Sequence, residues 1–478
     1  MISHSPGSGN HSSSIVGKLQ RVVSSIMELR EECGIFGIYD AGGNCAKSTY
    51  YGLYALQHRG EEDCGIAAIN ELELSCHKGS GLVGDVFSEK ILDKLNGTMA
   101  IGHVRHSGAN GDLRESAQPL TLTYIKGSLA VAHNGSIINS AELKREYEYK
   151  GAVFHTTTDS EIIAYIIAQA RLHSGSAEAA VNQAMKRLKG AFSIVVMSSR
   201  KLIAARDPWG FRPLCIGRKN GCIIFASESC ALDSVGATFL RDVEPGEVVW
   251  VYEGELHSNR ENCTEKSALC IFEHLYFARP DSVIDGQSVY DARVLAGRYL
   301  AGKYRIHADV VIGVPDSGLV AAKGYSLETG IPYNDGFIKN RYIGRTFISP
   351  TDSGRREAVK IKLNPLRATI SGKRVVLIDD SIVRGTTSVQ IIGLLREAGA
   401  KEIHVLISSP KFISPCYYGT NIPSKKVLFA CKYTTEEMRS IIGADTLGFL
   451  DLECLAKTTP NSKCNFCDAC FSENYPVL

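Results

Sequence analysis

No stretch of this 478-residue chain approaches the roughly 18 consecutive apolar residues that a membrane-spanning helix requires. An excess of one charge is also missing. The 53 basic and 51 acidic residues leave a formal net charge of +2, which argues against a protein that mainly binds nucleic acid. No apolar signal segment begins the chain, and no repeat or low-complexity segment follows residue 26. These absences leave an ordinary globular protein of about two to three domains, with no expected membrane or nucleic-acid partner.

Cysteine, by contrast, is abundant, with fifteen residues spread over the chain. Disulfide-built proteins are short and secreted, whereas this chain is long and shows no secretory signal, so an oxidised framework is not expected. We therefore expect reduced thiols that carry out chemistry or hold a metal, in a cytoplasmic protein.

The first 26 residues are rich in Ser and Gly and contain Lys18 and Arg21 but no acidic residue. This composition is typical of a disordered tail or of an over-long start, with Met27 as the more plausible beginning. It is also typical of an organelle transit peptide, which is Ser-rich and poor in acids. A plastid location is therefore the alternative to the cytoplasm.

Two different hydrophobic patterns divide the chain near residues 252–268, a polar stretch. Before it, short strand-like runs broken by glycine alternate with amphipathic helical patterns, which predicts a strand-rich α+β domain. After it, continuous apolar runs alternate with helical patterns, which predicts an α/β domain with a buried parallel sheet. The predicted strands are 34–39, 64–69, 129–132, 192–197, 222–226, 310–314, 374–378 and 403–407, and the clearest helices are 160–172, 176–188 and 388–398.

The strongest local signal is the strand, loop and helix pattern at residues 375–388. The buried strand delivers Asp379 and Asp380 at its carboxyl end, and a loop with Gly385 and paired threonines leads into the helix. Ligands of open α/β sheets bind at that edge, and loop N–H groups before a helix suit a phosphate. Adjacent carboxylates suit ribose hydroxyls or Mg²⁺. A solvated loop with aspartate caps is the simpler alternative.

This segment resembles the phosphoribosyl-pyrophosphate (PRPP) signature of the type I phosphoribosyltransferases. The resemblance implies that Asp379 and Asp380 hold the ribose hydroxyls and the metal, while the following loop wraps the 5′-phosphate. It places an upstream loop with Ser317 beside the pyrophosphate, and the basic loop 339–347 where its charge would stabilise the leaving group. A solvated basic face is the alternative for that loop. The implied PRPP-binding residues are Lys339, Arg345, Asp379, Asp380, Ser381, Arg384, Gly385, Thr386 and Thr387, with Ser317, Asp379 and Asp380 at Mg²⁺.

A thiol, Cys33, stands directly before the first predicted strand. Alone, such a cysteine would usually be a small buried hydrophobe. Four later segments change that interpretation, because with Cys33 they follow the order of the class II glutamine amidotransferases, which they resemble. Those proteins are N-terminal-nucleophile enzymes. The four segments are 56–60, 102–106, 132–135 and 157–161.

Glutamine hydrolysis needs a nucleophile, a base and donors for the tetrahedral oxyanion. If the chain is cleaved before Cys33, the free α-amine has a pKa of about 8 and can act as the base. The resemblance implies an oxyanion hole, an arginine for the substrate carboxylate and an aspartate for its ammonium. The implied residues are Cys33, Asn134 and Gly135 for catalysis, and Arg59, Arg105 and Asp159 for glutamine binding.

With both signatures in one chain, residues 28–478 resemble the amidophosphoribosyltransferase family. The further matching segments are 206–214, 227–229, 245–247 and 272–282. The implied domains are a tail and propeptide (1–32), an αββα N-terminal-nucleophile glutaminase domain (33–262) and a type I phosphoribosyltransferase domain (263–478). The implied reaction is the first step of de novo purine biosynthesis. Glutamine, PRPP and water give 5-phosphoribosylamine, glutamate and pyrophosphate, and ammonia passes internally between the sites. A homotetramer inhibited by purine nucleotides is also implied.

Two departures from the family pattern concern the glutaminase half. The family usually has Gln after His-Arg-Gly, whereas this chain has Glu61 in the run Glu-Glu-Asp. The residues after Arg105 are His106, Ser107 and Gly108 instead of Tyr and a Ser/Thr pair. These departures keep open an impaired paralogue that binds PRPP or nucleotides as a regulator. A sugar isomerase or asparagine synthase is disfavoured by the phosphate signature, and a salvage transferase by the glutaminase half.

The repeated C-x-x-C at 464–470 supports structural zinc and an iron–sulfur cluster about equally. A subgroup of the family carries a [4Fe–4S] cluster together with a cleaved propeptide. By that resemblance the ligands are Cys270, Cys416, Cys467 and Cys470, which leaves Cys464 as a spare. Such a cluster would be structural or oxygen-sensing.

Overall fold

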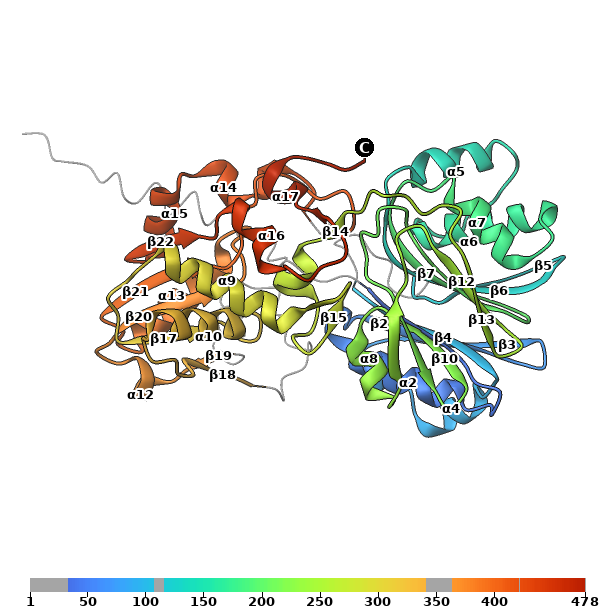
Figure 1. The fold of residues 1–478 in the computed structure, drawn as a ribbon, viewed down its shortest axis with the longest axis horizontal. Helices are drawn as coiled ribbons and strands as arrows, with labels where there is room; N and C mark the ends of the chain where they lie inside the picture. Colours follow the sequence, from blue (N-terminus) through green and yellow to red (C-terminus); the bar gives the residue numbers. More distant parts are fainter. Residues whose placement is uncertain (1–32, 107–115, 341–362, 421, 478) are drawn as a thin grey trace, which may run out of the picture.

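The computed structural model describes residues 33–106, 116–340, 363–420 and 422–477, which form two parts side by side (Figure 1). The first part stacks two sheets between layers of helices, and the second surrounds one parallel sheet with helices. The predicted αββα glutaminase fold and the predicted parallel α/β fold are confirmed. Within the described ranges, no helix combines the length and apolar character needed to cross a membrane.

The first sheet has seven strands in the order β11-β9-β10-β1-β4-β2-β3, and its outer face is covered by α2 and α8. Its strands are β1 (Gly34–Tyr39), β2 (Asp63–Asn70), β3 (Glu73–Ser80), β4 (Met99–Arg105), β9 (Cys215–Lys219), β10 (Cys222–Ala226) and β11 (Thr238–Asp242). Its helices are α2 (Cys45–Ala55), α3 (Val83–Val86), α4 (Glu89–Lys94) and α8 (Ser229–Ser234), with a 3₁₀ turn η1 (Gln57–Arg59).

The second sheet has six strands in the order β13-β12-β8-β7-β6-β5, with α6 and α7 on its outer face. Its strands are β5 (Leu120–Tyr124), β6 (Gly127–Ile137), β7 (Gly190–Ser198), β8 (Leu202–Arg206), β12 (Val248–Tyr252) and β13 (Glu255–Asn259). Its helices are α5 (Ser140–Glu148), α6 (Asp159–His173) and α7 (Ala177–Met185). The domain boundary was expected within the polar stretch 252–268. The first part of that stretch is a strand of this sheet, because β13 pairs with β12 at the sheet edge.

The two sheets pack through a layer of buried side chains that alternate along each strand. Ile35 on β1 and Ile101 on β4 lie in one cluster with Val195 on β7 and Ala204 on β8. The neighbouring Phe36 turns to the opposite face of β1 and packs with the α2 and α8 side chains. Because β1 is buried on both faces it reads as an unbroken apolar run, so its observed bounds equal the predicted ones.

The second part is built on four parallel strands in the order β17-β20-β21-β22. They are β17 (Val310–Gly313), β20 (Arg374–Asp379), β21 (Glu402–Ile407) and β22 (Thr446–Phe449). The helices are α9 (Val289–Lys303), α10 (Gly318–Thr329), α12 (Arg367–Ile370), α13 (Thr386–Glu397), α14 (Phe429–Lys432), α15 (Thr435–Ile442), α16 (Leu455–Thr458) and α17 (Ala469–Ser472). A π-helical turn, η2 (Glu273–Phe277), precedes α9, and the remaining 3₁₀ turns are η3 (Lys425–Val427) and η4 (Leu452–Cys454).

Three two-stranded pairs complete the second part. They are β14 (Leu269–Cys270) with β23 (Phe466–Cys467), β15 (Val283–Ile284) with β16 (Gln287–Ser288), and β18 (Phe337–Lys339) with β19 (Leu363–Pro365). In the main sheet, Gly313 on β17 is in register with Ile378 on β20. The two loops that follow these strands therefore leave the same edge of the sheet, which is where ligands of open α/β sheets bind.

Helices α9 and α10 pack backbone against backbone at two glycines. A Cβ added to Gly297 would lie 1.9 Å from the carbonyl oxygen of Ala321, and one added to Gly324 would lie 2.1 Å from that of Val294. Neither backbone can withdraw without separating the helices, so only glycine fits at these two positions.

We expect Gly324→Ala to destabilise the protein by about 2 kcal/mol, because the added methyl group overpacks this crossing. The measurement is the free energy of unfolding in urea. Gly302→Ala on the exposed side of α9 is the matched control, since a Cβ there meets nothing within 4 Å. It should stabilise the helix by about 0.5–1 kcal/mol. Equal destabilisation by both changes would contradict the close packing.

Candidate functional sites

Cys33, Arg105 and Asp63 lie at one end of the first sheet, where β1, β4 and β2 are neighbours. Gly34 after Cys33 pairs with Val104, and Asp63 pairs with Arg105. Cys33 is half-buried. Burial raises the pKa of its thiol, while the His106 backbone hydrogen bond and the charges of Arg105 and Arg59 oppose that rise.

Asn134 and Gly135 lie on β6, in the second sheet, close to the same end of β4. Two histidines link the sheets here, since the His103 ring Nε2 lies 3.1 Å from the carbonyl oxygen of His133. The Asn134 side chain is fully buried, and neither its amide nitrogen nor its amide oxygen has a partner among the described residues. An unsatisfied buried amide costs about 1–3 kcal/mol, so this side chain is poised for a ligand.

Gly135 has a backbone conformation that other residues avoid. Its φ is +132°, and a Cβ there would lie 2.1 Å from the carbonyl oxygen of Ala191 on β7. Asp159 is the first residue of α6. Its carboxylate accepts a 2.7 Å hydrogen bond from the backbone N–H of Ile137, the last residue of β6. The thiol and the arginine thus lie together at one end of the first sheet, and the buried amide and the carboxylate lie on and beside β6 of the second sheet.

The Arg59 side chain runs from Cys33 into the interface between the two parts. Its side chain is fully buried and pairs with Glu228 at 2.5 Å and with Glu273 at 2.7 Å. Its Nε also donates to the carbonyl oxygen of Cys33 at 3.3 Å. Arg59 was predicted to bind glutamine, but these contacts place its guanidinium against two glutamates and the nucleophile's own backbone.

Glu228 and Glu273 extend this buried network to both sides. Glu228 is 2.7 Å from the His58 ring, and Glu273 is 3.6 Å from the Arg212 guanidinium. Burial alone would raise the pKa of Glu228, but the charges of His58 and Arg59 hold it below its ordinary value. We call these five residues (His58, Arg59, Arg212, Glu228 and Glu273) the interface network.

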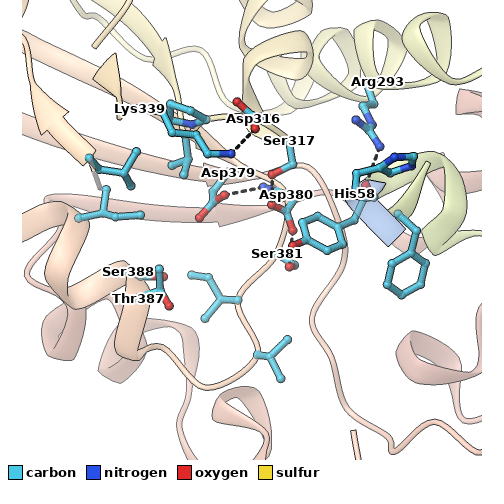
Figure 2. Close-up of a pocket in the computed structure, with 18 of the residues that line it drawn as sticks. His58, Arg293, Asp316, Ser317, Lys339, Asp379, Asp380, Ser381, Thr387 and Ser388 are labelled. Atoms are coloured by element: carbon cyan, nitrogen blue, oxygen red, sulfur yellow. Dashed lines mark hydrogen bonds and ion pairs between the residues drawn. The ribbon is translucent and has the colours of Figure 1, made fainter. Parts of the chain in front are cut away.

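A cavity of about 430 Å³ opens at the carboxyl end of β20, and Figure 2 shows the side chains around it. Asp380 accepts hydrogen bonds of 2.5 Å from the hydroxyls of Ser317 and Ser381. Lys339 forms an ion pair with Asp316 on the facing loop. Burial, followed by the charge of Asp380, raises the pKa of Asp379 well above its ordinary value. A bound cation or hydroxyl donor would relieve this pair of carboxylates.

Nine of the residues predicted for PRPP and its metal line this cavity. They are Ser317, Lys339, Asp379, Asp380, Ser381, Arg384, Gly385, Thr386 and Thr387. Gly385 has a φ of +81° and ends the loop directly before α13, so its conformation aims the loop into the helix N-terminus. Arg345 lies outside the described residues.

The cavity also contains residues that the sequence did not predict, and two of them come from the first part. His58 and Glu61 line it beside Arg279 and Arg293 of the second part. Figure 2 shows His58 and Arg293 near each other at the cavity. Arg293 is buried and donates to the carbonyl oxygens of His274 and Ala278 at 2.9 and 2.7 Å, which holds η2 against the cavity wall. No sequence signal places His58 at this cavity, because the residues before and after it in the chain belong to the first part, whereas the cavity lies at the sheet of the second part.

The four cysteines predicted as cluster ligands approach one another from three segments. Cys270 on β14 is in register with Cys467 on β23. Burial, followed by the charges of Cys270, Cys416 and Cys467, raises the pKa of Cys470 well above its ordinary value. The Cys416 sulfur accepts a 3.4 Å hydrogen bond from the Tyr418 backbone N–H. Within the described part of the chain, no three Cys, His, Asp or Glu side chains converge tightly enough for a single metal ion.

Cys464 belongs to a different environment. Its pKa is raised by burial to about 12, with the charge of Asp285 as the next cause. Asp285 is itself paired with the buried Arg206 at 2.7 Å. Cys464 therefore faces an ion pair, whereas the other four thiols face one another.

Comparisons with known proteins agree with both parts of the chain. Residues 103–234 match a glutamine amidotransferase domain family, and residues 285–411 match a phosphoribosyl transferase domain family. An amidophosphoribosyltransferase of Methanocaldococcus jannaschii is 47% identical, over 93% of this chain and 98% of that protein. A chloroplastic amidophosphoribosyltransferase 1 of Arabidopsis thaliana is 45% identical, over 94% of this chain and 79% of that protein.

A solved structure of the Bacillus subtilis glutamine PRPP amidotransferase, complexed with ADP and GMP, has the same fold. Its TM-score is 0.86 at 45% identity, covering 93% of this chain and 98% of that chain. A second solved structure, described as the allosteric regulatory enzyme of purine biosynthesis, has a TM-score of 0.87 at 45% identity, with 93% and 96% coverage.

We expect Glu273→Ala to lower the free energy of unfolding by about 3 kcal/mol or more, because it removes one partner from buried Arg59 and Arg212. Urea denaturation followed by circular dichroism measures the change. The control is Glu244→Ala, which removes the glutamate of a half-exposed ion pair with Arg260 and should cost about 1 kcal/mol or less. Equal losses would mean that the interface network contributes no more than a surface pair.

Proposed function

The chain belongs to the amidophosphoribosyltransferase family, and from that premise we propose how its residues carry out the reaction. The protein is an amidophosphoribosyltransferase, which catalyses the first step of purine biosynthesis. Glutamine, PRPP and water are converted to 5-phosphoribosylamine, glutamate and pyrophosphate. The observation that carries this function is the presence of two separate sites, one thiol-based and one phosphate-binding, in a single chain.

In the glutaminase half, the Cys33 sulfur attacks the side-chain amide carbon of glutamine. The amide nitrogen leaves as ammonia, and water then cleaves the thioester to release glutamate. The Asn134 amide and the Gly135 N–H stabilise the oxyanion, a role supported by the unpartnered buried amide of Asn134. Arg105 takes the substrate α-carboxylate, and Asp159 takes its ammonium.

Arg59 acts on this reaction indirectly. Its guanidinium holds Glu228 and Glu273 and donates to the carbonyl oxygen of Cys33. We therefore give it the role of a positioning residue that supports the backbone of the nucleophile, in place of direct contact with glutamine.

In the transferase half, ammonia attacks C1 of PRPP, and pyrophosphate leaves. Asp379 and Asp380 hold the ribose hydroxyls, and the loop from Ser381 to Thr387 receives the 5′-phosphate at the N-terminus of α13. Lys339, which lines the cavity, is the proposed contact of the departing pyrophosphate. Arg345, outside the described residues, is assigned the same role. Ser317, Asp379 and Asp380 fit Mg²⁺ through their clustered oxygens, and the ion when bound would neutralise pyrophosphate charge.

The proposed domain division is a tail with propeptide (1–32), a glutaminase domain (33–262) and a transferase domain (263–478). The pairing of β13 within the second sheet supports placing the boundary after residue 259. The propeptide lies outside the described residues. Its cleavage would give Cys33 a free α-amine, the base that the glutaminase chemistry requires.

Cys270, Cys416, Cys467 and Cys470 are the proposed ligands of a [4Fe–4S] cluster. Burial, and after it the charges of neighbouring cysteines of this set, raise the pKa values of Cys270, Cys467 and Cys470. Thiols gathered in this way suit a cationic group that binds them as thiolates. The Tyr418 N–H bonded to the Cys416 sulfur is the kind of contact that tunes such a cluster. We assign the cluster a structural or oxygen-sensing role, because no described contact joins it to the Cys33 sulfur.

Purine nucleotides are the proposed inhibitors and a homotetramer the proposed assembly. The Bacillus subtilis relative was solved with ADP and GMP, which supports nucleotide binding here. The proposed location is the cytoplasm, with the plastid as the alternative if residues 1–26 act as a transit peptide.

We expect Cys33→Ala to lower glutamine-driven pyrophosphate release by at least about a thousandfold while ammonia-driven release continues, because only the glutaminase step uses the thiol. The measurement is a coupled assay for glutamate and pyrophosphate with PRPP and Mg²⁺. Cys76→Ala, at an exposed cysteine on β3, is the control and should behave as wild type. The intact mass of active wild type should correspond to a chain that begins at Cys33.

Retention of glutamine-driven activity by Cys33→Ala would contradict the assigned nucleophile. PRPP binding by wild type without any glutamine- or ammonia-driven pyrophosphate release would instead indicate the regulatory paralogue.

We expect anaerobically purified wild type to contain iron and acid-labile sulfide in equal amounts, about four of each per chain. Cys470→Ser should lose both, because its thiol lies among the other three ligands. Cys464→Ser is the matched control and should retain them, since that thiol faces Asp285. Stoichiometric zinc without iron in wild type would contradict the cluster.

A further inference from the structure

Asp63 places a carboxylate directly beside the arginine that is assigned to the substrate's carboxylate. It begins β2, where it pairs with Arg105 of β4 on one side and with Ser80 of β3 on the other. Its Oδ2 lies 3.5 Å from Nη1 of Arg105, and its Oδ1 accepts a 2.8 Å hydrogen bond from the Ser80 hydroxyl. The residue is 1% exposed.

This carboxylate cannot move away when a ligand enters. Both neighbouring strands hold the backbone of Asp63 in register, and the Ser80 hydroxyl holds one side-chain oxygen. The acid before it has a different partner, since the Glu62 carboxylate lies 3.6 Å from the His106 ring. Asp63 is thus a carboxylate that lies within ion-pair distance of Arg105.

Any second carboxylate that binds Arg105 is repelled by the negative charge of Asp63, which lies 3.5 Å from the guanidinium. The Arg105 side chain is 12% exposed and that of Asp63 is almost completely buried. Water therefore screens charge–charge interactions at this position poorly. Glutamine brings its α-carboxylate to Arg105 and must share the guanidinium with Asp63. A substrate whose α-carboxylate is masked would meet no such repulsion.

We propose that Asp63 is a specificity-determining residue that weakens binding of the α-carboxylate of glutamine at Arg105 and narrows the preference for glutamine over carboxylate-masked analogues. This proposal rests on the proposed role of Arg105 in glutamine binding. It concerns the amide-donor side of the reaction only, so ammonia and PRPP should bind as before.

The test compares wild type with Asp63→Ser and Asp63→Asn in the pyrophosphate-release assay. We expect the KM for glutamine to fall by about tenfold in both variants, as removal of a like charge from a covered site predicts. The KM values for ammonia and PRPP should change by less than about twofold. The asparagine variant keeps the side-chain volume and the acceptor for Ser80, which protects the fold.

Glutamine α-methyl ester supplies the second readout. Wild type should use glutamine and the ester with kcat/KM values within about tenfold of each other, whereas both Asp63 variants should prefer glutamine by about a hundredfold. Glu73→Gln is the matched control, because it removes one carboxylate at the opposite end of β3. It should leave both ratios unchanged.

A glutamine KM that stays constant or rises in both variants would overturn the proposal and make Asp63 an anchor that orients Arg105. A wild type that rejects the ester by more than about a thousandfold would overturn it without any variant. Arg105→Gln is measured in parallel. If that variant keeps the wild-type KM for glutamine, the failure lies in the proposed role of Arg105 and not in the effect of Asp63.

Discussion

The arrangement of both sites depends on the ion pairs of one buried side chain, Arg59. It pairs with Glu228 of the first part and Glu273 of the second, and it donates to the carbonyl oxygen of Cys33. A charge removed from water must keep its partners, because leaving one unpaired costs several kcal/mol. The two parts therefore cannot shift against each other without breaking the support of the nucleophile.

Residues at this interface between the two parts also belong to, or contact, the thiol site, the phosphate cavity and the segment that holds Cys416. His58 bonds Glu228 and also lines the cavity at the end of β20. A Cβ at Gly419, three residues after the ligand candidate Cys416, would lie 2.8 Å from Arg212 and 3.6 Å from the backbone carbon of Gly135. The thiol site, the phosphate cavity and the cysteine segment are thus joined through one buried surface, which suits a reaction that passes ammonia from one site to the other.

The sequence was informative wherever a function is built from contiguous residues. The loop from Asp379 to Thr387 joins a buried strand to a helix N-terminus, and each of these features has its own local pattern. Strand β1 was placed correctly because burial on both faces leaves an unbroken apolar run. Strand β13 was missed because it lies at a sheet edge, where polar side chains hide the strand pattern.

The sequence by itself determined the order of the two folds, the thiol that precedes β1 and the phosphate loop, because hydrogen bonding and side-chain periodicity act over a few residues. Only the tertiary structure decided that Arg59 meets Glu273, 214 residues away, and that Asp63 meets Arg105 across a strand pair. It also brought His58 to the phosphate cavity. These contacts depend on which surfaces the packed cores bring together, and no local pattern encodes that choice.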